Sequence, residues 1–127
     1  MRERIRSQKI AFITDQLKLS SKEAQNFWPI FNKYESDVED IKNGELRSIR
    51  RTLRSGERLS DKEANDLITR LITAETSIHD LRVNLVSDLR SVLSPQKILR
   101  LKVADEEFNK RLLEKLREMR EKGDNRN

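Results

Sequence analysis

Cysteine is absent from this 127-residue chain, and histidine occurs only once, at His79. Without thiols the chain can form no disulfide framework, thiolate metal site or cysteine nucleophile. One histidine supplies no set of zinc ligands, and no evident base is available for a catalytic triad. Glycine-rich phosphate-binding motifs are missing as well. These absences argue against an enzyme and predict no catalytic residue, no cofactor and no metal.

Glycine and proline are scarce, with only three and two residues in the chain. A β-sandwich or barrel needs many turns between short strands, so this composition favours a single all-α domain over 1–127. No run of about 18 apolar residues is present, which predicts no transmembrane segment. Residues 1–6 also lack the apolar stretch of a secretory signal. A cytosolic protein and the mature segment of an exported protein both fit these features.

Charge is abundant and mixed in sign: 27 basic and 22 acidic residues give a net charge of +5. Most charges alternate in sign at helical spacing, which is typical of solvated helix faces. The exception is a group of arginines that shares one side of a predicted helix and the bend after it: Arg47, Arg50, Arg51, Arg54 and Arg58. Guanidinium groups in such a group can hold carboxylates or phosphates. Two interpretations stay open: a solubilising face with intersubunit salt bridges, or a positive patch that attracts unfolded or acidic partners.

Three helix starts are marked by a Leu-Ser pair. Ser20 and Ser60 are each followed three positions later by glutamate, Glu23 and Glu63, which is the pattern of a capping box. Ser94 is followed by Pro95, which suits the first position of a helix. With a shorter helix in front, the sequence predicts four helices, at about 3–18, 21–54, 61–92 and 95–121, and a fraying polar tail at 122–127.

Apolar residues form narrow stripes along the two long central helices. The second helix carries a stripe that ends in Ile49 and Leu53, and the third carries a heptad seam. The short link at 55–58 predicts a long antiparallel hairpin. Such a hairpin has a thin core, so we expect exposed apolar flanks and a homodimer that covers them. Proline in a helix interior predicts a kink at Pro29, and Gly44 is a second weak point.

Aromatic residues are concentrated in the segment Phe27-Trp28-Pro29-Ile30-Phe31. Aromatics at helical spacing most often belong to a core. Trp28, however, lies beside the Phe27 and Phe31 stripe and next to the predicted kink. A partly exposed tryptophan there could anchor an apolar segment of a partner. We therefore take Phe27, Trp28 and Phe31, together with the arginine group, as the candidate partner-binding residues.

The same residues carry a family resemblance. Leu19-Ser20, Glu23 and Gln25, followed by Phe27-Trp28-Pro29, resemble the first repeat of the LTxxQ family of small periplasmic proteins, which includes the Spy/CpxP-like chaperones and metal-responsive sensors. Leu93-Ser94-Pro95-Gln96 resembles the second repeat. Serine replaces threonine in both repeats, and Gln96-Lys97 stands where the second would end in glutamine. Residues 8–14 and 104–108 are similar to a Bacteroidetes-type branch that is often labelled as sensors of extracytoplasmic-function sigma factors.

The resemblance implies a four-helix, hairpin-built fold that dimerises into a curved cradle in the periplasm. It also implies a protein that holds partly unfolded polypeptides without ATP, or reports envelope stress to a regulator. One alternative is a dedicated signalling partner of a membrane-bound sigma-factor regulator. A second is a basic helical protein that binds nucleic acid, although no aromatic residues for base stacking lie near the arginine group and no nucleic-acid partner is expected.

Overall fold

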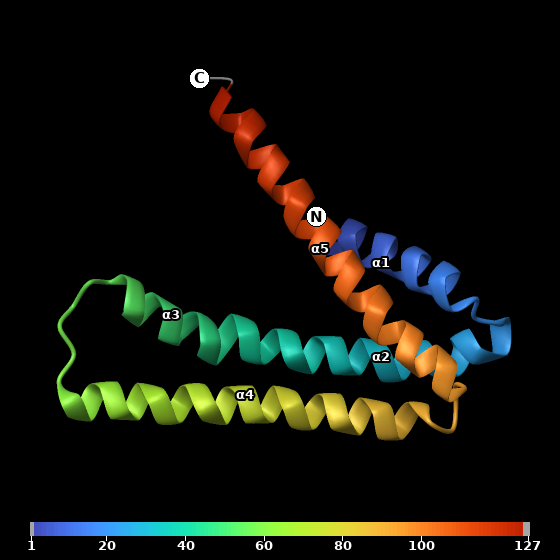
Figure 1. Ribbon diagram of the computed structural model, residues 1–127, viewed down its shortest axis with the longest axis horizontal. Coiled ribbons are helices and arrows are strands. Elements are labelled where there is room, and N and C mark those ends of the chain that lie inside the picture. Colours follow the sequence, from blue (N-terminus) through green and yellow to red (C-terminus); the bar gives the residue numbers. More distant parts are fainter. Residues whose placement is uncertain (1, 126–127) are drawn as a thin grey trace. The chain divides into compact units, whose positions relative to one another are not determined.

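A computed structural model describes residues 2–125 of the chain, with the side chains of residues 3–123. The described part is helical throughout, with loops and no strand, which confirms the predicted all-α class (Figure 1). It contains four helical runs, the second of which has an irregular turn inside it. The elements are α1 (Arg2–Leu17), α2 (Ser21–Ile41), the π-helical turn η1 (Lys42–Leu46), α3 (Arg47–Arg54), α4 (Asp61–Leu89) and α5 (Pro95–Asn125).

The helix starts follow the local signals in the sequence. The Ser20 Oγ accepts a hydrogen bond from the Glu23 N–H at 3.1 Å, and the Glu23 carboxylate accepts one from the Ser20 N–H at 3.0 Å. The same reciprocal pair joins Ser60 and Glu63 at the start of α4. These bonds satisfy backbone donors that have no partner inside the helix, which is why S-x-x-E marks a helix start.

The helix ends differ more from expectation. α4 ends at Leu89 rather than near residue 92, and residues 90–92 form a turn that leads to Ser94. α5 continues through Gly123 to Asn125, so most of the expected polar tail at 122–127 is helical; residues 126–127 lie outside the described part. Glycine weakens a helix by about 1 kcal/mol without necessarily ending it.

The irregularity in the second helical run lies at Gly44. α2 stays α-helical across Pro29, whereas residues 42–46 form a π-helical turn in which the Arg47 N–H donates to the Lys42 carbonyl, five residues back. A π turn widens the helix by one residue and changes which side chains face the core beyond it. Ile49 and Leu53 were both expected in the apolar stripe, yet Ile49 is 3% exposed and Leu53 is 62% exposed. The prediction of Leu53 as a core residue is therefore wrong.

The chain divides into two compact units, and the first joins residues 1–25 to residues 93–127. In this unit α1 contacts α5. The rings of Phe12 and Phe108 lie 5.8 Å apart, and the Arg111 guanidinium lies 5.2 Å from the centre of the Phe12 ring. Lys9 forms an ion pair of 2.8 Å with Asp105. The buried apolar residues of these helices are Ile13, Leu17, Leu101 and Ala104.

The second unit comprises residues 26–92, which include most of α2 together with η1, α3 and α4. The Tyr34 hydroxyl accepts a hydrogen bond from Arg82 Nε at 3.4 Å, and the Glu45 carboxylate accepts one from Arg70 Nε at 3.2 Å. Glu45 follows Tyr34 in the chain, but its partner Arg70 precedes Arg82, so the two segments run in opposite directions beside each other (Figure 1). Along α4 the buried residues Leu67, Ala74 and Leu85 belong to the predicted heptad seam.

Candidate functional site

Four arginines line a shallow surface hollow on α3. Arg47, Arg50, Arg51 and Arg54 face this hollow together with Ser55, and no apolar side chain lines it. The spacing of three and four residues places the four side chains on one face of the helix, over a length of about 10 Å. Arg58 does not line the hollow; it lies in the loop at 55–60. The structure therefore brings together four of the five arginines singled out from the sequence.

Two arginines elsewhere in the chain have carboxylate partners, whereas these four have none among the described side chains. Arg70 pairs with Glu45, and Arg111 pairs with Glu107. Among the residues whose side chains the structure describes, no acidic group forms an ion pair with Arg47, Arg50, Arg51 or Arg54. α3 itself contains no acidic residue. The positive charge of this face is thus left uncompensated within the second unit.

The aromatic segment is built mainly as core. The rings of Phe27 and Phe31 stack 5.2 Å apart, and Trp28 meets both edge-on at 4.8 Å and 5.9 Å. Phe27 is fully buried and Phe31 is 2% exposed, whereas Trp28 is half-buried. Phe27 and Phe31 therefore expose almost no surface that a partner could contact. Only Trp28 of the three keeps an accessible face.

A groove along α2 and α4 was not found from the sequence. Its walls carry apolar side chains, one basic side chain and two acidic ones. The lining residues are Pro29, Ile30, Lys33, Tyr34 and Asp37 of α2, with Leu81, Asn84, Leu85 and Asp88 of α4. Lys33 and Asp37 pair across one helical turn at 3.1 Å. Trp28 directly precedes the first lining residue, Pro29. The three- and four-residue spacings on both helices were visible in the sequence, but which faces meet depends on how the helices pair.

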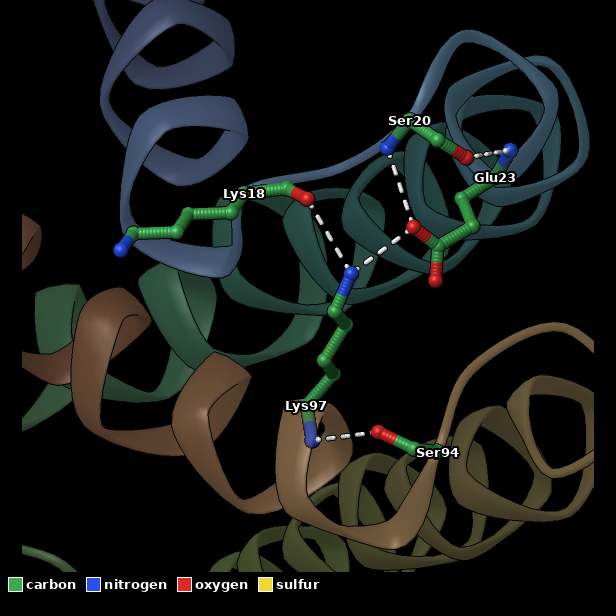
Figure 2. Close-up of polar contacts among 5 residues, drawn as sticks. All are labelled: Lys18, Ser20, Glu23, Ser94 and Lys97. Atoms are coloured by element: carbon green, nitrogen blue, oxygen red, sulfur yellow. Dashed lines mark hydrogen bonds and ion pairs between the residues drawn. The ribbon is translucent and has the colours of Figure 1, made fainter.

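The two serine motifs of the sequence meet in the first unit (Figure 2). Lys97 Nζ donates to the Glu23 carboxylate at 2.8 Å and to the Lys18 carbonyl at 3.1 Å, while the Lys97 N–H donates to Ser94 Oγ at 3.3 Å. Lys18 has a left-handed backbone, with φ of 51°, and this conformation ends α1. One lysine thus links the end of α1, the capping box of α2 and the start of α5.

This ion pair changes the acidity of the glutamate. The hydrogen bond from the Lys97 ammonium, followed by the one from the Ser20 N–H, holds the pKa of the Glu23 carboxyl below its usual value of 4.5. Both donors favour the ionised form, and they outweigh the loss of hydration, which acts in the opposite direction. The arrangement ties helix ends together and offers no group poised for proton transfer. Its role is structural.

The other residues of the resemblance have simple positions. Leu93 is buried and Leu19 is half-buried, so both leucines of the repeats act as apolar anchors beside the helix starts. The four remaining motif residues are exposed to solvent: Gln25, Pro29, Pro95 and Gln96. Pro29 contributes instead to the groove of the second unit.

His79 is exposed on α4, and within residues 2–125 no three His, Cys, Asp or Glu side chains are grouped so as to hold a metal ion. Nor does any helix in that range combine the length and apolarity needed to cross a bilayer. Comparisons with protein-family models, curated proteins and solved structures give no match to this chain.

Proposed function

We propose that this chain is a non-enzymatic helical protein that binds polypeptide segments without ATP, in a chaperone-like or envelope-stress-sensing role. The observation that carries the proposal is the groove between α2 and α4. It combines apolar side chains with Lys33, Asp37 and Asp88, next to the half-buried Trp28. Apolar walls gain free energy from the side chains of many different sequences, and charges of both signs at the rim tolerate varied clients.

The arginine face contributes to client binding at longer range. Its uncompensated charge attracts acidic polypeptides and speeds their encounter with the second unit, while apolar contacts in the groove hold them loosely. If the arginine face attracts the client and the groove holds it, added salt should slow client association more than it speeds dissociation, because salt screens long-range attraction most strongly.

A homodimer and a periplasmic location form part of the same proposal. Large apolar side chains are exposed four residues apart on α4, at Ile68 and Ile72, and on α5, at Leu99 and Val103, each more than half accessible. Side chains at this spacing share a helix face, and such faces are usually covered by a partner. The resemblance to the Spy/CpxP-like family supports a cradle-like dimer of hairpins. A mass of twice 15.0 kDa in sedimentation equilibrium would support the dimer.

The test of polypeptide binding is suppression of aggregation of a chemically unfolded client, with a matched pair of variants. Leu81→Gln changes the groove, whereas Leu113→Gln changes an exposed leucine of α5 outside it. We expect Leu81→Gln to lose most of the suppression and Leu113→Gln to retain it, with both variants equally helical by circular dichroism.

The same experiment separates the rival function. Equal activity of the two variants would contradict the assignment of the groove. If the wild-type chain suppressed no client but bound one membrane-bound regulator, the chain would be a dedicated signalling partner and the general chaperone role would be refuted.

A further inference from the structure

The hollow on α3 has a lining that differs in kind from the groove. The groove offers apolar walls, whereas the hollow is lined by Arg47, Arg50, Arg51, Arg54 and the polar Ser55. The two share no lining residue. Apart from the methylene stems of the arginines, the hollow offers no apolar side chain, so a polypeptide gains little from hydrophobic burial there. A ligand of this hollow must therefore be recognised by its charge and its hydrogen-bond acceptors.

The density of positive charge defines the ligand further. Four guanidinium groups stand on two turns of helix, about 10 Å in length, with neighbouring pairs about one turn apart. Each guanidinium presents a planar fork of N–H donors that matches two phosphate oxygens. A phosphate carries up to about two charges and three acceptor oxygens, so it can occupy two forks at once. Two or three linked phosphates would occupy all four guanidinium groups.

The face is also unfavourable for the free protein. Arginines three or four residues apart on one helix repel each other, at about 0.2–0.5 kcal/mol for each pair, and no described carboxylate relieves this repulsion. A multivalent anion would remove the repulsion when it binds. Binding should therefore raise the thermal stability of the chain.

We propose that the arginine hollow is a binding site for a soluble oligophosphate, a ligand with two or more linked phosphate groups. In the proposed function this face only attracts acidic clients at long range, and the phosphate site goes beyond that role; it does not depend on binding in the groove, since the groove and the hollow share no lining residue. A nucleic-acid site of comparable affinity would need more phosphate contacts and aromatic stacking residues, and neither is present along these two turns. A membrane-binding helix would need a continuous apolar face next to the charges, whereas Leu53 is the one large apolar side chain that α3 exposes.

The test uses the full chain and inorganic triphosphate at physiological ionic strength, measured by calorimetry and by thermal unfolding. The matched variants each remove two positive charges. Arg47→Gln with Arg51→Gln changes the hollow, whereas Arg58→Gln with Arg117→Gln changes arginines outside it. We expect triphosphate to bind the wild type and the outer variant alike, and to bind the hollow variant about tenfold more weakly or worse.

Several outcomes would overturn the proposal. Equal weakening in both variants would show that net charge alone attracts the anion. Inorganic orthophosphate binding as tightly as triphosphate would refute the need for linked phosphates. Tighter binding of single-stranded DNA, of polyglutamate or of phosphatidylglycerol vesicles, lost in the hollow variant, would assign the face to nucleic acid, to acidic polypeptide or to lipid instead. If Leu81→Gln lost aggregation suppression but still bound triphosphate, the phosphate site would be supported independently of the groove.

Discussion

Two apolar residues one turn apart on α3 should contribute very differently to stability. Ile49 is 3% exposed and Leu53 is 62% exposed. Changing Ile49 to alanine removes three buried carbon atoms at about 0.8 kcal/mol each and leaves a partly unfilled cavity, for a total of about 3 kcal/mol. The better helix propensity of alanine returns up to about 0.5 kcal/mol. The same change at Leu53 should cost less than about 1 kcal/mol, because most of that side chain already meets water.

The measurement is urea unfolding of both variants, followed by far-ultraviolet circular dichroism. Because the chain has two compact units, amide hydrogen exchange should accompany it and show where protection is lost. We expect a loss of about 2–3 kcal/mol for Ile49→Ala, with faster exchange in α3 and the facing part of α4. If Leu53→Ala cost as much as Ile49→Ala, or if Ile49→Ala cost less than about 1 kcal/mol, the described register beyond the π turn would be wrong.

Three further predictions follow from local geometry. Because the pKa of Glu23 is lowered in the folded chain, its ionised form stabilises the fold above about pH 4.5, and this contribution is lost as the pH falls through the folded pKa. Lys97→Met should raise the Glu23 pKa toward 4.5 in a carboxyl NMR titration, and an unchanged pKa would contradict the ion pair. Gly44→Ala should stabilise the chain by about 0.5–1 kcal/mol, whereas Gly56→Ala should destabilise it by about 1–2 kcal/mol. Neither added Cβ meets an atom, but Gly56 has a left-handed backbone with φ of 73°. Thermal melts of the two variants that shift in the same direction would refute this. Ser60→Ala removes the cap of α4 and should cost about 1 kcal/mol in urea unfolding, and Ser60→Asp, which can still accept the Glu63 N–H, should restore most of the loss.

Signals that act within a few residues could be interpreted from the sequence alone. The helix starts at Ser20, Ser60 and Ser94 depend on hydrogen bonds between residues three positions apart, so the local sequence is enough to predict them. The all-α class followed from the scarcity of turn formers and from helical periodicity. The clustering of four arginines on one face followed from the spacing within a single helix.

Contacts between helices were decided by the tertiary structure. The sequence marked Glu23 and Lys97 as parts of separate motifs, and only the fold brings the ammonium within 2.8 Å of the carboxylate. Periodicity counted Phe27 and Trp28 alike as aromatic candidates, but packing buries one and leaves the other half-exposed. The groove likewise needs two helices to meet in one register. Bonds between residues three or four positions apart can be predicted from the sequence, whereas the burial of a side chain depends on which helix packs against it. One extra residue in a helical turn is enough to change which side chains are buried.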